Sequence, residues 1–113
     1  MEINNAISCF SALSQETRLE SFKLLVKAGP SGIAAGDLAE ALSATAPAMS
    51  FHLKELANAG LATSRKEGRS VFYAANYGGI RDLIDFLMDD CCQGDRRLCG
   101  PYVIPDRSPS QTA

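Results

Sequence analysis

The sequence lacks the features of a membrane or secreted protein. None of its apolar runs approaches the roughly 20 residues that a membrane-spanning helix needs. The opening MEINNAISCF has neither the basic start nor the long apolar stretch of a secretory signal. These absences predict a cytoplasmic protein with no membrane partner. We find no internal repeat, and 113 residues are enough for one domain with one hydrophobic core.

The chain also has little net charge, with 11 basic residues against 13 acidic ones. The distribution is uneven. Basic residues exceed acidic ones between Thr45 and Asn76, whereas five aspartates and no basic residue lie between Asp82 and Asp95. This pattern fits the binding of a polyanion on one side of the molecule, and it fits an ordinary mixed surface equally well.

Catalytic motifs are also scarce. The chain has a single histidine, His52, and no glycine-rich phosphate loop. Four cysteines would supply nucleophiles for a thiol oxidoreductase or an arsenic reductase, but nothing else in the sequence supports catalysis. We therefore expect neither an enzyme nor an organic cofactor.

Helical periodicity covers the first half of the chain. It predicts helices from Ile3 to Leu13 and from an N-cap at Ser14 to Ala28, the second with Leu19, Phe22, Leu25 and Val26 on one face. Gly29-Pro30 ends the second helix. A third helix is predicted from Ala35 to Leu42.

A fourth helix is predicted from an N-cap at Thr45 to Ala59, with Pro47 in its first turn and Met49, Leu53 and Leu56 facing inward. Two short helices joined by a tight turn form a helix-turn-helix. Strands are predicted next, from Leu61 to Lys66 and from Ser70 to Ala75, around a turn at Glu67-Gly68. The fold class is therefore mainly α with a small β-hairpin wing (α+β), a winged helix-turn-helix in the order α-α-α-α-β-β-α.

A last helix is predicted from Tyr77 to about Gly94, with an apolar stripe. The stripe consists of Ile80, Leu83, Ile84, Leu87 and Met88. We expect residues 1–94 to form the DNA-binding and dimerisation domain. Residues 95–113, which carry Cys99 and three prolines, are expected to form a largely flexible tail.

Four segments resemble the ArsR/SmtB family of bacterial metal-sensing repressors, in that family's order and spacing. They are LSQETRLESFKLL (Leu13 to Leu25), DLAEAL (Asp37 to Leu42), SFHLKELANAGL (Ser50 to Leu61) and KEGRSVFYAAN (Lys66 to Asn76). The resemblance covers about Ser11 to Cys92. It implies a transcriptional repressor that binds double-stranded operator DNA.

The resemblance implies DNA contacts from the fourth helix and from the wing. Family members often have polar or basic residues at positions 46, 48 and 51, where this chain has Ala, Ala and Phe. Recognition is therefore expected to rely on contacts to thymine methyl groups and on DNA shape. The alternative is that the winged-helix scaffold binds another protein and does not bind DNA. The expected DNA-binding residues are Thr45, Ala46, Ala48, Ser50, Phe51, His52, Arg65, Lys66 and Arg69.

The resemblance also implies a homodimer joined by the first and last helices. The alternative for the apolar stripe is that it covers the core of the single chain. The expected dimerisation residues are Ile3, Ile7, Phe10, Ile80, Leu83, Ile84, Leu87 and Met88.

The spacing of the cysteines predicts the inducer, the ligand that would release the repressor from its operator. Cys91, Cys92 and Cys99 lie close together in the sequence with no histidine nearby. Thiolates select soft ions, and trivalent arsenic prefers three sulfurs, so we expect arsenite to be the inducer ligand, with antimonite and methylarsenite as variants. The resemblance agrees, because some arsenic-responsive relatives have this arrangement. Two other family sites are missing, since Ile33 to Asp37 has no cysteine and the last helix has no histidine.

Other chemistries remain open for the same cysteines. Asp90 or Asp95 could complete a zinc or cadmium site. A thiol-based redox switch is the third alternative, because the cysteines could form disulfides and Arg96 and Arg97 could lower a thiol pKa. Cys9 stands apart and is expected to be a small buried residue of the first helix rather than a ligand.

Overall fold

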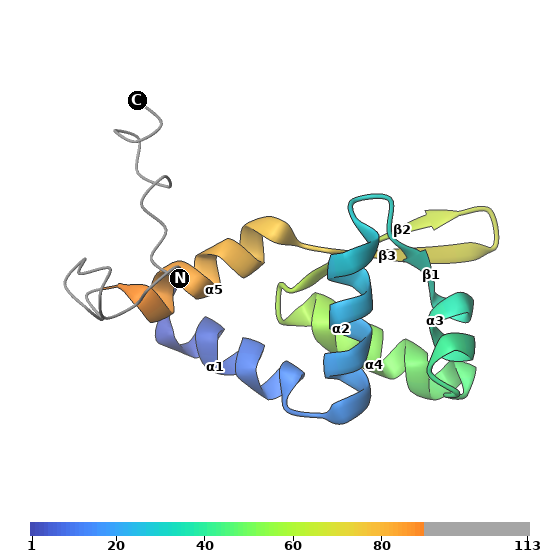
Figure 1. Ribbon diagram of the computed structural model, residues 1–113, viewed down its shortest axis with the longest axis horizontal. Coiled ribbons are helices and arrows are strands. Elements are labelled where there is room, and N and C mark those ends of the chain that lie inside the picture. Colours follow the sequence, from blue (N-terminus) through green and yellow to red (C-terminus); the bar gives the residue numbers. More distant parts are fainter. Residues whose placement is uncertain (90–113) are drawn as a thin grey trace.

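The computed structural model describes residues 1–89, and positions 90–113 lie outside the described part. The elements follow the order α1 (Ile3–Leu13), α2 (Glu16–Ala28), β1 (Ile33–Ala34), α3 (Ala35–Ala41), α4 (Ala46–Asn58), β2 (Ala62–Glu67), β3 (Ser70–Ala75) and α5 (Tyr77–Met88). This is the predicted α+β winged helix-turn-helix with one additional strand. In Figure 1, α1 and α5 lie at the end of the molecule opposite the tip of the β2–β3 hairpin.

Helices α1 (Ile3–Leu13) and α2 (Glu16–Ala28) form the first pair. The prediction of Ser14 as the N-cap of α2 is wrong: the Gln15 side chain accepts from the Arg18 N–H at 2.8 Å, whereas the Ser14 hydroxyl donates to Ser11 O. Helix α2 ends, as predicted, before Gly29, whose φ of 88° suits a residue without a Cβ.

The buried face of α2 differs from the predicted one. Leu25 is fully buried, but Leu19 and Val26 are 43% and 40% exposed. Ser21 takes an inward position, where its Oγ donates to Thr17 O at 2.8 Å. The local hydrogen bond satisfies this buried hydroxyl, so a polar residue occupies the face that periodicity assigned to apolar side chains.

The sheet contains a strand that the sequence did not reveal. Strand β1 (Ile33–Ala34) pairs antiparallel with β3 (Ser70–Ala75), and β3 pairs antiparallel with β2 (Ala62–Glu67), which gives the order β1-β3-β2. Gly32 (φ 77°) allows β1 to approach, because a Cβ there would collide with the carbonyl of Tyr73.

The predicted turn of the hairpin is off by one residue. Glu67 pairs with Ser70, so Gly68 and Arg69 are the two central residues. Of these two, only Gly68 has positive φ, at 63°. Positive φ at the first central position alone is the pattern of a type II′ turn, which prefers Gly there.

The remaining helices are α3 (Ala35–Ala41), α4 (Ala46–Asn58) and α5 (Tyr77–Met88). The part of the predicted last helix beyond position 89 lies outside the described residues. The core is formed by side chains from α1 to α5 and from the strands, and its fully buried aliphatic residues stabilise the fold by about 1.5–3 kcal/mol each. These residues are Leu25, Leu38, Met49, Leu53, Leu56 and Leu61.

Within residues 1–89, no helix is long and apolar enough to cross a membrane.

Candidate nucleic-acid interface

The turn between α3 and α4 fixes the angle of the helix-turn-helix. Ser43 adopts a φ of 53°, and the N–H of Ala44 donates to Ala39 O at 2.9 Å. A left-handed residue followed by this bond is a Schellman C-cap. It ends α3 abruptly and leaves Thr45 free to start α4.

Helix α4, called the recognition helix below, begins as the sequence predicts. Thr45 Oγ1 accepts from the N–H of Ala48 at 3.2 Å, and a proline occupies the first turn. Met49, Leu53 and Leu56 are all fully buried and hold one side of the helix against the core. The opposite side is therefore directed to solvent along the whole first turn.

The expected DNA-binding residues of the recognition helix differ in their exposure to solvent. Thr45, Ala46 and Ala48 are exposed, and Ser50 is half-buried. Phe51 is 57% exposed, which is unusual for a large aromatic ring in a single chain. The recognition helix thus presents small side chains in its first turn, followed by one large apolar ring, to solvent.

His52 has a partner that sequence reasoning missed. Nη1 of Arg18, on α2, lies 3.1 Å from Nδ1 of the His52 ring. Partial burial lowers the pKa of His52 below its usual value of 6.5, and the positive charge of Arg18 lowers that pKa further. No local sequence signal could have found this contact, because 34 positions separate the two residues.

The wing carries three basic side chains in different environments. Arg65 is held within the hairpin, since its Nε donates to Glu67 Oε2 at 2.6 Å and its guanidinium lies 4.8 Å from the centre of the Phe72 ring. Lys66 and Arg69 are exposed. In the part of the chain that the structure describes, neither has an ion-pair partner, so both are free to meet phosphate.

The residues expected at the dimer contact divide into two groups. Ile3, Ile7, Phe10 and Leu87 are between 45% and 64% exposed, on α1 and α5. Leu83, in contrast, is only 8% exposed and belongs to the core. Ile80 is partly buried and packs against this core. Ile84 and Met88 are half-buried. The α5 stripe thus covers the core at its buried edge and leaves an apolar face at its outer edge.

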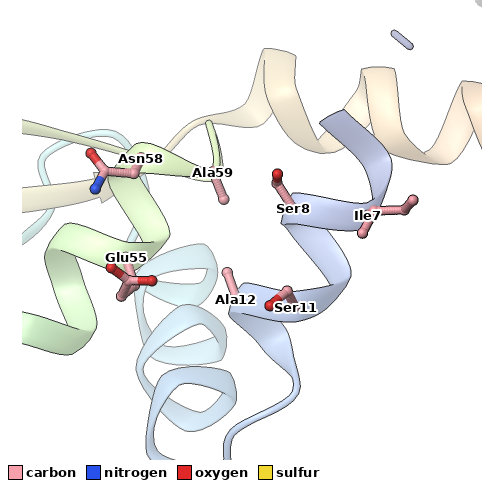
Figure 2. Close-up of a pocket in the computed structure, with 7 residues that line it drawn as sticks. All are labelled: Ile7, Ser8, Ser11, Ala12, Glu55, Asn58 and Ala59. Atoms are coloured by element: carbon pink, nitrogen blue, oxygen red, sulfur yellow. The ribbon is translucent and has the colours of Figure 1, made fainter. Parts of the chain in front are cut away.

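A groove of about 310 Å³ is lined by residues of α1 and of the C-terminal half of the recognition helix. Figure 2 shows Ala12 and Ala59 facing each other across it, while Ile7 points away from α4. Ile7, which is 57% exposed, therefore lines the groove with its side chain directed away from the recognition helix.

The expected inducer ligands Cys91, Cys92 and Cys99 lie outside the described residues. Cys9 is inside, only 1% exposed, and its Sγ donates to Ala59 O at 3.3 Å. Burial raises the pKa of the Cys9 thiol. A protonated, buried thiol is a poor soft-metal ligand, which agrees with the expectation that Cys9 packs rather than ligates. Among residues 1–89, no three His, Cys, Asp or Glu side chains are grouped to hold a metal ion.

Comparison with known families and proteins gives a consistent result. A helix-turn-helix domain model matches residues 13–65. The transcriptional repressor SdpR of Bacillus subtilis is 32% identical over 89 residues, which cover 79% of this chain and 96% of SdpR. The arsenical resistance operon repressor of Staphylococcus aureus is 35% identical over 87 residues, covering 77% of this chain and 81% of that protein.

A solved structure agrees. An ArsR-like transcriptional regulator from Rhodococcus sp. RHA1 superimposes with a TM-score of 0.68 at 32% sequence identity. The match covers 85% of this chain and 88% of the Rhodococcus chain. The similarity therefore extends beyond the helix-turn-helix.

Proposed function

The chain belongs to the ArsR/SmtB family of winged-helix transcriptional regulators, and we propose that it is a homodimeric repressor released from operator DNA by trivalent arsenic. The recognition helix and the wing bind the operator. Cys91, Cys92 and Cys99 bind arsenite. Its relatives are DNA-binding regulators, which supports a role outside catalysis.

The observation that carries this proposal is how closely Cys91 and Cys92 follow α5 in the sequence. Cys91 and Cys92 follow Met88, the last residue of α5, by three and four positions. Helix α5 packs against α1, and these two helices carry the exposed apolar face described above. An ion held just beyond α5 is therefore well placed to alter the dimer contact.

The donor set suits the proposed inducer. Thiolate sulfur selects soft ions, and the three cysteines lie within nine consecutive positions. The name of the Staphylococcus aureus relative, an arsenical resistance repressor, supports arsenic as the choice. Antimonite and methylarsenite share the same preference for sulfur.

The start of α5 is tied to the end of the recognition helix, which gives a route for the signal. Asn76 Nδ2 donates to Gly60 O at 2.9 Å, and the Asn76 N–H donates to Leu61 O at 3.0 Å. A shift of α5 would thus move the end of α4 with it. Complete release requires about 5.5 kcal/mol of differential binding, and operator DNA must weaken arsenite binding by the same factor.

A gel shift with the DNA upstream of the protein's own gene tests the proposal. The reduced protein should shift the band, arsenite should abolish the shift, and Cys91→Ser should keep the shift in arsenite. Cys9→Ala is the matched control, because it removes a cysteine that is buried elsewhere, and it should still be released. Failure of wild-type protein to bind any fragment would overturn the proposal.

The same assay separates the alternative inducers. Titration of reduced protein with arsenite should produce sulfur-to-arsenic absorption that saturates at one ion per chain. Release by zinc or cadmium but not by arsenite would reassign the site to those metals. Release by an oxidant alone, reversed by a reductant, would make the cysteines a redox switch.

A further inference from the structure

The guanidinium of Arg18, on α2, links this helix to α1 and to the recognition helix. Arg18 is half-buried in the first turn of α2, and its Nε donates to Ala12 O at 2.7 Å near the end of α1. Its Nη1 lies 3.1 Å from His52 Nδ1, and its Cζ lies 6.0 Å from the centre of the Phe51 ring. The side chain is therefore held at both its Nε and its Nη1.

The chemistry of this contact selects one form of the histidine. A guanidinium has only hydrogen-bond donors, so Nδ1 of His52 has to be the acceptor. A neutral imidazole that accepts at Nδ1 carries its proton on Nε2. The protonated ring would instead turn an N–H towards the N–H of Arg18. Only the neutral Nε2–H tautomer satisfies both side chains.

The other edge of the ring is left for a ligand. Within residues 1–89, His52 Nε2 has no protein partner, although Nδ1 does. Phe51 stands beside it, with the two ring centres 5.8 Å apart in an edge-on arrangement. An unpaired N–H donor thus lies next to an exposed aromatic ring on the outer side of α4.

We propose that Arg18 is a positioning residue for operator binding, which fixes His52 as an Nε2–H donor to a phosphate or base acceptor. The inference rests on the proposed operator binding and assigns Arg18 a role that acts through His52. Partial burial, followed by the charge of Arg18, lowers the pKa of His52, which keeps the ring in the required neutral form near pH 7.

The first test needs no DNA, because His52 is the only histidine in the chain. Protein labelled with ¹⁵N-histidine gives a single pair of ring-nitrogen NMR signals, which report both the tautomer and the titration midpoint. Wild-type protein should show the Nε2–H form, and Arg18→Gln should show a mixture of tautomers with a higher midpoint. Lys23→Gln removes one positive charge from the exposed side of the same helix and should change neither. Unchanged signals in Arg18→Gln would overturn the inference.

The second test is a double-mutant cycle on operator affinity. Arg18→Gln should weaken binding by about two- to tenfold, the usual range for one hydrogen bond. In a His52→Ala background, the same change should have no further effect. Arg18→Lys should also weaken binding, because one ammonium group does not hold Ala12 O and His52 Nδ1 together. Thermal denaturation confirms that each variant is folded.

The outcomes distinguish this inference from the proposed function. Additive losses, with a salt dependence flatter by about 0.9 units of slope in Arg18→Gln, would show that Arg18 contacts phosphate itself. That result would overturn the positioning role and leave the repressor proposal intact. A wild-type protein that binds no operator would instead overturn the repressor proposal, and the recognition role of Arg18 with it.

Discussion

The side-chain amide of Asn76 donates from Nδ2 to the carbonyl oxygen of Gly60 at 2.9 Å, and this bond fastens the start of α5 to the end of α4. The same side chain accepts from the N–H of Gly79 at 3.2 Å through Oδ1, as the N-cap of α5. One residue therefore both starts the helix at the proposed dimer contact and ties it to the recognition helix.

Asn76→Ala should lower the free energy of unfolding by about 2 kcal/mol, since it removes a helix cap and a bond to a partly buried carbonyl. It should also reduce the arsenite-induced loss of operator affinity while arsenite still binds. Urea denaturation and gel shifts measure the two effects. Asn58→Ala, at an exposed position in the last turn of α4, is the control and should change neither. If arsenite still released Asn76→Ala completely from operator DNA, the contact between Asn76 and Gly60 would be excluded as the route of the signal.

Gly79→Ala should destabilise the protein by about 1–3 kcal/mol, because a Cβ there would be pushed into the Gly60 carbonyl and would lie 3.1 Å from Asn76 Nδ2. The adjacent Gly78→Ala is a closely matched control, since its Cβ would meet only Asn76 Oδ1 at 3.6 Å. Alanine favours a helix over glycine by about 1 kcal/mol, so Gly78→Ala should be neutral or stabilising. Urea denaturation of both variants measures the contrast, and equal effects would contradict the tight α4–α5 contact.

Arg69→Ala in the wing should flatten the salt dependence of operator binding by about 0.9 units of slope, because Arg69 is exposed at the hairpin turn and available to phosphate. Arg65→Ala should change the slope less, since Glu67 already pairs with Arg65. Glu67→Gln should tighten binding, because it frees Arg65 and removes a negative charge near DNA. The measurement is affinity across a series of salt concentrations. Equal slopes for wild type and Arg69→Ala would show that Arg69 does not contact the phosphates of operator DNA.

Acidification should destabilise the fold through His52. Burial and the charge of Arg18 lower its pKa in the folded protein below 6.5, so the unfolded chain binds the proton more readily. The free energy of unfolding therefore falls as the pH drops from about 6.5 through the folded pKa. His52→Gln should make stability less dependent on pH in this window. Denaturation between pH 5 and pH 7 tests this, and parallel pH profiles for the two proteins would contradict it.

Ile7→Glu should convert the proposed dimer to a monomer, because Ile7 is 57% exposed on the outer face of α1 and a buried, unpaired carboxylate at an interface is costly. Leu19→Glu, at a position of α2 that is 43% exposed, provides a matched control and should leave the oligomeric state unchanged. Sedimentation velocity measures both. A monomeric wild-type protein, or a dimer that tolerates Ile7→Glu, would reject this face as the contact.

Local patterns predicted the recognition helix closely. The cap at Thr45, the proline in the first turn and the spacing of Met49, Leu53 and Leu56 all act within four residues, and the structure confirms each of them. The expected DNA-binding residues followed from the family resemblance and not from charge, because α4 offers few charged side chains in its first turns. Whether those side chains contact DNA stays a prediction.

Strand β1 shows where local patterns were insufficient. Ile33–Ala34 is too short to display an alternating pattern, and it is a strand only because Phe72 and Tyr73 lie beside it. Gly32 was visible in the sequence, but its need for a missing Cβ depends on the carbonyl of Tyr73, which is distant along the chain.

The sequence by itself determined the helices of the described residues, the cap of the recognition helix at Thr45 and the spacing of the cysteines, since periodicity, capping and ligand spacing depend on residues a few positions apart. Only the tertiary structure decided that Arg18 meets His52 and that Asn76 meets Gly60, across 34 and 16 positions. Such contacts form when packing of the shared core brings separate segments together, and no short-range pattern specifies which side chains will then face each other.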